Sequence, residues 1–201
     1  MKKLIFLTTI LLGMVLLIPI FAQSSVGDIW FVPSDPIAVE VGTEFRTEIH
    51  ANTGTQQFCS YSIEITYNPD IISPNTSVGN SSVEAGPDGF VTSVNLTSPG
   101  ILEISGFNAN GKGPGDNLNV LIISWNADTQ NPDSIDDLGI TIDYFKDPAS
   151  NNIGVPTGID GAVDVFILGD VTEDGSVTIN DSLAVAQYYV GLNPQLFLLL
   201  H

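Results

Sequence analysis

Oxygen-bearing side chains recur at short intervals between residues 170 and 181. The segment begins at Asp170, has Gly175 at its sixth position and ends at Asp181. Ca²⁺ takes six to eight oxygen ligands, and a twelve-residue loop can supply them from positions 1, 3, 5, 7, 9 and 12. Glycine at the sixth position allows the positive φ of the sharp turn there. The spacing therefore predicts a calcium-binding loop.

The expected ligands follow from these loop positions. Ser176 would contribute its backbone carbonyl and Thr178 a side chain or a bridging water, and the set is Asp170, Thr172, Asp174, Ser176, Thr178 and Asp181. The pattern is that of an EF-hand with two departures, because position 12 is Asp instead of a bidentate Glu and position 3 is Thr. An acidic Asp-Gly turn that binds no ion is the alternative interpretation.

A short helix is expected directly after this loop, over residues 181–191. Asn180 or Asp181 can cap its start, and Gly191 can end it. Loop and helix together form a small C-terminal EF-hand-like unit, residues 168–191.

This unit resembles the first repeat of a type I dockerin, a family in which position 12 of the loop is Asp. The resemblance implies that loop positions 10 and 11, here Ile179 and Asn180, contact a cohesin together with the exposed side of residues 183–187. A dockerin has two such repeats and this sequence contains one, so the unit is a half-module. Residues 192–201 follow as an apolar tail.

The elements before the loop are predicted to be short strands. Apolar and polar residues alternate over 45–50 and again over 59–67, which is the period of a half-buried strand. Residues 73–89 and 108–119 are rich in Gly, Pro, Ser or Asn and are predicted loops. The chain from 28 to 167 holds about nine such strands at roughly 10-residue spacing. We expect an all-β, antiparallel, nine-stranded jelly-roll β-sandwich over residues 26–167.

This region resembles a cohesin domain. The similarity lies in four stretches taken in order: 32–45, 61–70, 99–108 and 138–143. It implies a nine-stranded jelly roll that binds dockerin-bearing secreted proteins, among them polysaccharide-degrading enzymes, through one sheet face. A cohesin and a dockerin repeat in one chain also raise self-association as an expectation.

The N-terminus has the pattern of a secretory signal peptide, assigned to residues 1–25. Lys2 and Lys3 precede the apolar run 4–20, and small residues follow, with cleavage expected after Ala22. An uncleaved anchor is the alternative, since 17 residues can just span a membrane. The mature protein is expected to be extracellular, either free or associated with the cell surface.

Composition excludes several classes of function. The 201 residues carry 5 Lys and Arg against 23 Asp and Glu, a net charge of -18, so no nucleic-acid partner is expected. Cys59 is the single cysteine and is predicted to be a buried hydrophobe, and with two His a zinc site is poorly supplied.

No catalytic residue is predicted. Glu44, Glu48, Glu64 and Glu103 fall at outward strand positions and are expected to be solvated. The alternative to a scaffolding module is a carbohydrate-binding sandwich, which would need a row of exposed aromatics on one sheet face. The candidates are Trp30, Trp125, Tyr61 and Tyr67, of which both tyrosines are in phase with core residues. A polysaccharide therefore stays open as a further partner.

Overall fold

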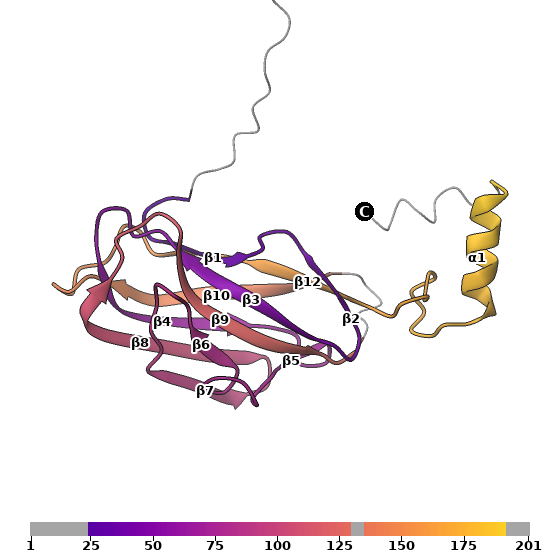
Figure 1. The fold of residues 1–201 in the computed structure, drawn as a ribbon, viewed down its shortest axis with the longest axis horizontal. Helices are drawn as coiled ribbons and strands as arrows, with labels where there is room; N and C mark the ends of the chain where they lie inside the picture. Colours follow the sequence, from indigo (N-terminus) through magenta and orange to yellow (C-terminus); the bar gives the residue numbers. More distant parts are fainter. Residues whose placement is uncertain (1–23, 130–134, 192–201) are drawn as a thin grey trace, which may run out of the picture.

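Two six-stranded sheets form the body of the protein in a computed structural model that describes residues 24–129 and 135–191 (Figure 1). The first sheet has the order β11-β1-β3-β9-β5, with β6 also paired to β9, and the second has the order β2-β12-β10-β4-β8-β7. The strands are β1 (Asp28–Val32), β2 (Ile37–Glu40), β3 (Glu44–Ala51), β4 (Phe58–Thr66), β5 (Ile72–Pro74), β6 (Val83–Ala85), β7 (Ser93–Ser98), β8 (Ile101–Lys112), β9 (Leu118–Ala127), β10 (Ile135–Lys146), β11 (Thr157–Ile159) and β12 (Gly161–Phe166).

The expectation of a fully antiparallel nine-stranded sandwich needs correction. The described residues contain twelve strands, and two pairs, β1 with β11 and β2 with β12, run parallel. The additional strands include β5 and β6, which lie inside the predicted loop 73–89 or at its edge and pair with β9. Each has three residues, too few to show alternation in the sequence.

The predicted loop 108–119 is also shorter than expected. β8 continues to Lys112, and β9 begins at Leu118. The exposed residues at the end of a long strand do not alternate between apolar and polar types. The sequence pattern therefore predicts a loop where the strand continues.

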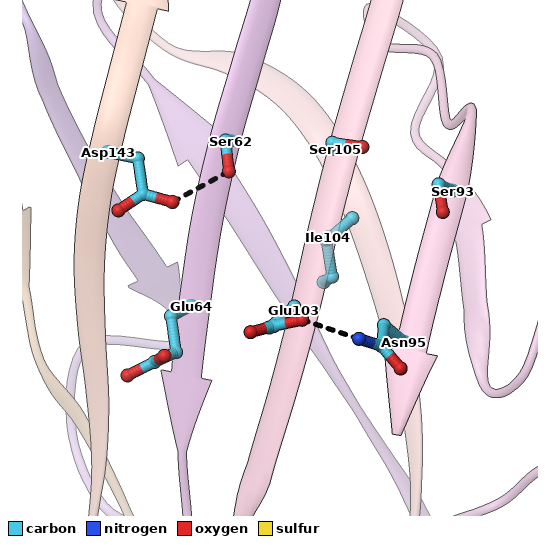
Figure 2. Close-up of a pocket in the computed structure, with 8 residues that line it drawn as sticks. All are labelled: Ser62, Glu64, Ser93, Asn95, Glu103, Ile104, Ser105 and Asp143. Carbon is cyan, nitrogen blue, oxygen red and sulfur yellow. Dashed lines mark hydrogen bonds between the residues drawn. The ribbon is translucent and has the colours of Figure 1, made fainter. Parts of the chain in front are cut away.

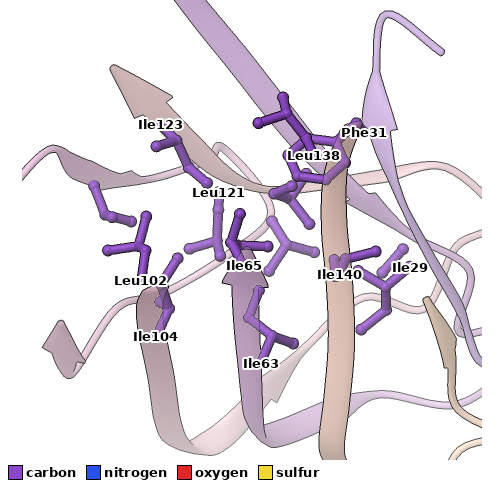
Figure 3. Packing of buried hydrophobic residues seen from close by; sticks show 14 of the residues in the cluster. Ile29, Phe31, Ile63, Ile65, Leu102, Ile104, Leu121, Ile123, Leu138 and Ile140 are labelled. Atoms are coloured by element: carbon purple, nitrogen blue, oxygen red, sulfur yellow. The ribbon is translucent and has the colours of Figure 1, made fainter. Parts of the chain in front are cut away.

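The core lies between the two sheets and follows the alternation of the strands. Ile63 and Ile65 from β4 face Leu121 and Ile123 from β9 across the sandwich, and all four are at most 1% exposed (Figure 3). The largest fully buried side chain is Trp125, whose indole Nε1 donates a hydrogen bond of 2.9 Å to Thr47 Oγ1. Cys59 is buried, as predicted.

A bulge in β10 changes which residues point inward. The register to β4 shifts between Ile142 and Tyr144, so that Phe145 is 1% exposed while Tyr144 is half-buried. Strict alternation along β10 would place Tyr144 in phase with Leu138, but it fails beyond Ile142, since a bulge adds one residue to one strand.

The helix α1 (Ile179–Tyr189) follows the sandwich and stands beyond the end of the sheets (Figure 1). Its N-cap is Thr178, not Asn180 or Asp181 as expected. The Thr178 side chain accepts from the Asn180 N–H, and Asp181 at the third helical position accepts from the Thr178 N–H, which completes a capping box. Gly191, with φ of 74°, follows the C-cap residue Val190 and ends the helix as predicted.

Two sequence predictions concern the chain ends. The signal peptide lies almost wholly outside the described residues, and the apolar tail 192–201 lies outside them entirely. Within 24–129 and 135–191, no helix is both long and apolar enough to cross a membrane.

Candidate functional site

A shallow hollow of about 330 Å³ lies on the outer face of β10, β4, β8 and β7. Alternate residues of these strands point away from the core, and those outward residues line the hollow together with the buried Ile104 (Figure 2). The lining residues are Ser62, Glu64, Ser93, Asn95, Glu103, Ile104, Ser105 and Asp143. We call this surface the acidic face.

Hydrogen bonds between neighbouring strands hold two of its side chains. Ser62 Oγ on β4 donates to Asp143 Oδ2 on β10 at 2.8 Å, and Asn95 Nδ2 on β7 donates to Glu103 Oε2 on β8 at 2.6 Å (Figure 2). Each carboxylate is therefore oriented by a polar neighbour on the adjacent strand.

Charge on this face has one sign. Glu64 and Glu103 are direct partners across β4 and β8, Asp143 lies one strand away, and no Lys or Arg is among the lining residues. The serines of the hollow have no His beside them, so the lining lacks a nucleophile with its base. The arrangement suits contact with another macromolecule that brings hydrogen-bond donors or positive charge.

Sequence reasoning placed Glu64 and Glu103 at outward positions but did not recognise the acidic face as a site. Ser62, Ser93, Asn95, Ser105 and Asp143 were not singled out. Their only signal in the sequence is an outward position on a strand, which many surface residues share. Pairing of β4 with β8 and β10, and of β7 with β8, brings them together.

In the C-terminal loop, the structure brings Asp170, Thr172 and Asp181 together. Thr172 Oγ1 is 2.9 Å from Asp181 Oδ1 and 3.4 Å from Asp170 Oδ1. Asp170 also accepts from the Gly175 N–H at 2.8 Å, which holds the turn at the sixth loop position. Gly175 has φ of 85°, as predicted for that position.

Asp181 joins the two ends of the loop. Its Oδ1 accepts from the Val171 and Thr172 N–H groups and its Oδ2 from the Thr178 N–H at 2.6 Å, while its side chain is only 2% exposed. These bonds, led by that of the Thr178 backbone, hold the pKa of Asp181 well below its usual range. Asp181 is therefore an ionised acceptor at neutral pH.

Thr178 is exposed but also contacts this group, because its Oγ1 lies 3.2 Å from Asp181 Oδ2. The predicted ligands Asp174 and Ser176 are less closely gathered, and Asp174 Oδ1 accepts from the Ser176 N–H at 3.1 Å. Among the described residues, no three acidic, His or Cys side chains are grouped so as to hold a metal ion. The donors are all oxygen, the type that Ca²⁺ prefers. The type of donor atom therefore matches calcium. In this structure the carboxylates of Asp170, Asp174 and Asp181 accept hydrogen bonds from backbone N–H groups.

The predicted partner-contacting residues are both on the surface. Ile179 is 80% exposed, and Asn180 is also exposed. Leu183 on the same helix is 54% exposed, so the first turns of α1 present apolar side chains to solvent.

The four candidate aromatic residues do not form an exposed row. Trp125 and Tyr61 are fully buried, and Tyr67 is half-buried and packs on Trp125. Burial raises the pKa of Tyr61, whose hydroxyl donates to the Phe90 carbonyl. Only Trp30 of the four candidates lies at the outer surface of a sheet, where it is half-buried.

The strand order and the two facing layers define a β-sandwich with the cohesin fold. A cohesin module of a family 33 glycoside hydrolase from Clostridium perfringens has 15% identity and a TM-score of 0.56, covering 71% of this chain and 98% of that chain. The sixth cohesin of scaffoldin B from Acetivibrio cellulolyticus, solved in complex with a Cel5 dockerin mutant, has 12% identity and a TM-score of 0.55, with 71% and 100% covered. A type I cohesin from Clostridium thermocellum, solved in a cohesin–dockerin complex, has 13% identity and a TM-score of 0.55, also with 71% and 100% covered.

No protein-family description matches the sequence, and no curated protein matches it. At these identities the solved structures establish the fold of the sandwich, and they confirm the cohesin-like architecture expected from the sequence at that level.

Proposed function

We propose that this protein is a non-catalytic extracellular scaffolding module that binds dockerin-bearing, polysaccharide-degrading enzymes through the acidic face. The observation that carries the proposal is an open polar hollow on a sheet of a fold whose solved relatives include cohesins in complex with dockerins. A wide, shallow surface without a nucleophile–base pair fits protein recognition better than turnover.

The charge of the acidic face specifies the partner further. Glu64, Glu103 and Asp143 stand on a chain of net charge -18, so a partner surface with Lys or Arg is favoured and a strongly acidic one is repelled. Association is then expected to slow as salt is raised, because exposed charges are screened.

Capture of secreted proteins tests the proposal. The full chain is immobilised and exposed to the secreted proteins of its source organism, with Ca²⁺ and then with a chelator, since dockerins bind calcium. We expect dockerin-bearing enzymes to be retained and then released by the chelator. Retention of no dockerin-bearing protein would overturn the proposal.

Two charge reversals locate the interface. Glu64→Lys places a cation at the centre of the acidic face and is expected to weaken capture at least tenfold. Glu40→Lys makes the same change at an exposed position on β2, at the far edge of the same sheet, and serves as the matched control. Equal loss in both variants would remove the acidic face from the proposal.

Calcium binding at residues 170–181 forms a second part of the proposal. Asp170, Thr172, Asp174 and Asp181 would supply side-chain oxygens, with Ser176 and Thr178 completing the set. Bound Ca²⁺ would neutralise the loop carboxylates and order the start of α1. Titration calorimetry of the full chain should show one site that is lost in an Asp170→Ala, Asp174→Ala double variant.

The control for that titration removes two exposed carboxylates elsewhere. Asp35→Ala with Asp70→Ala gives the same change in net charge outside the loop. Calcium binding that survives the loop variant would contradict the loop assignment.

Self-association through the half-dockerin unit completes the proposal. The exposed Ile179 and Leu183 provide apolar contact area for a second copy, while the net charge of -18 on each chain opposes their association. Sedimentation of the same monomer with and without Ca²⁺ would count against self-association.

N-terminal sequencing of the exported protein tests the predicted signal peptide, with Gln23 as the expected first residue.

A further inference from the structure

A second hollow, larger than that of the acidic face, lies on the other sheet. Its volume is about 490 Å³, within the range of small-molecule sites, and Trp30 lies in its lining. Ile29 and Phe31, on either side of Trp30 in β1, are 3% and 2% exposed and point into the core. The Trp30 side chain therefore projects from the outer face of this sheet, away from the core.

Cross-strand neighbours flank Trp30 on both sides. Ile159 on β11 is its parallel partner and is 43% exposed, and His50 on β3 is its antiparallel partner. The rings of Trp30 and His50 lie 6.0 Å apart between centroids, at 48°. The indole therefore lies between the side chains of Ile159 and His50, which restrict its orientation in the absence of a ligand.

Polar groups surround this aromatic centre. Asn117 Oδ1 lies 2.7 Å from His50 Nδ1, while His50 Nε2 lies 2.8 Å from Glu48 Oε2. This chain of contacts fixes the Asn117 amide and leaves its Nδ2 group as a donor for a ligand. Asp160 accepts from the Ile140 N–H through Oδ1 at 2.9 Å, which anchors that carboxylate and keeps Oδ2 as an acceptor.

Asp116, Ser24 and Ser34 complete the polar lining. One aromatic face with an amide, two carboxylates and two hydroxyls around it is complementary to a molecule with an apolar face and a rim of hydroxyl groups. A pyranose ring has that form, because its axial C–H bonds make an apolar face and its hydroxyls both donate and accept hydrogen bonds.

We propose that the hollow around Trp30 binds a neutral saccharide, with one sugar ring on the indole and its hydroxyls bonded to Asn117, Asp116 and Asp160. The two carboxylates repel uronic acids and sulfated sugars. The site lies on the sheet opposite the acidic face, so sugar binding is independent of protein capture.

The two tryptophans of the chain provide a direct readout. Trp125 is fully buried, whereas Trp30 is half-buried, so a collisional quencher reaches Trp30 first. The full chain is titrated with neutral hexasaccharides of glucose, xylose and mannose, with a galacturonic acid hexamer as the acidic comparison. We expect at least one neutral oligosaccharide to protect Trp30 from acrylamide, and the acidic hexamer to have no effect.

Three variants test the assignment, with binding measured by titration calorimetry because Trp30 is itself the fluorescent reporter. Trp30→Ala should weaken binding at least tenfold, and Asn117→Ala several-fold through loss of an amide donor. Phe107→Ala removes an aromatic side chain that is 63% exposed on the other sheet, and it should bind as the unmodified chain does. Thermal unfolding confirms that each variant is folded, and Trp30→Phe replaces Trp30→Ala if the latter is not.

The outcomes separate this proposal from its competitors. No binding by any neutral saccharide on a broad glycan array, or binding unchanged in folded Trp30 variants, would overturn it. Protection of Trp30 by tetramethylammonium alone would also overturn it, in favour of a cation site. Glu64→Lys should leave sugar binding intact, so failure of dockerin capture and failure of sugar binding are distinguishable.

Discussion

Glu64 and Glu103 lie directly opposite each other on β4 and β8, so two carboxylates occupy adjacent strands at the centre of the acidic face. Like charges in this relationship destabilise a sheet. Asn95 donates to Glu103 at 2.6 Å, and within the described residues Glu64 has no such donor. The pair is therefore a locally unfavourable arrangement within this sheet.

Neutralising Glu64 should therefore stabilise the sandwich. We expect Glu64→Gln to raise the free energy of unfolding by ~0.2–1 kcal/mol, because it removes repulsion and keeps the side-chain size. Urea unfolding at low salt measures the gain, which should shrink in high salt as the charges are screened. Glu40→Gln on the edge strand β2 is the control, and an equal gain there would show that the effect is net charge alone.

The buried bond between Trp125 and Thr47 should matter strongly for stability. Both residues are 0% exposed, so Thr47→Val leaves the indole N–H without a partner in the core. We expect a loss of about 1–3 kcal/mol in the free energy of unfolding. Thr47→Ser keeps the hydroxyl and removes one methyl group, so it should cost less. Equal loss in the two variants would assign the effect to packing instead.

Acid should release the C-terminal loop through Asp181. Its folded-state pKa is lowered, first by the Thr178 backbone N–H and then by Thr172, so its contribution to stability is complete above the ordinary value of 3.8 and is lost as pH falls through the folded value. The Thr178 amide NMR signal should stay constant from pH 7 to about 4 and change below it. A midpoint at or above 3.8 would contradict the prediction.

The matching substitution separates charge from shape. Asn at position 181 can accept on one side only, and its amide hydrogens would meet either the Thr178 N–H or the Val171 and Thr172 N–H groups. Asp181→Asn should therefore loosen α1 at neutral pH, seen as faster hydrogen exchange. Asp174→Asn should have a much smaller effect, because the Asp174 carboxylate accepts a single hydrogen bond, from the Ser176 N–H.

Glu173 has φ of 57°, in the left-handed region that costs an L-residue about 1–2 kcal/mol. Asn tolerates this region better than Glu, so Glu173→Asn should slow hydrogen exchange in the loop and in the first turn of α1. Glu84→Asn, on a strand of the sandwich, is the control for loss of one acidic side chain. Faster exchange in Glu173→Asn would show that the Glu side chain itself stabilises the loop.

The sequence predicted those features of the fold that depend on residues close together in the chain. Alternation over β3 and β4, the burial of Cys59 and the positive φ of Gly175 depend on neighbours within a few residues. Thr178 is the N-cap in place of Asn180 or Asp181 because α1 begins at Ile179, two residues before the expected start at 181. The three-residue strands β5 and β6 were missed because their pairing to β9 is their only signature.

Local chemistry in the sequence determined the β class, the inward phase of the strands, and a loop with oxygen donors followed by a helix. Tertiary pairing alone decided that Ser62, Glu64, Asn95, Glu103 and Asp143 share one hollow, and that Trp30 lies between Ile159 and His50. The physical reason is that both surfaces are built from strands far apart in the chain. The register between strands is a cooperative property of the whole sheet. The sequence of one strand therefore does not determine which outward residues of other strands will be its neighbours.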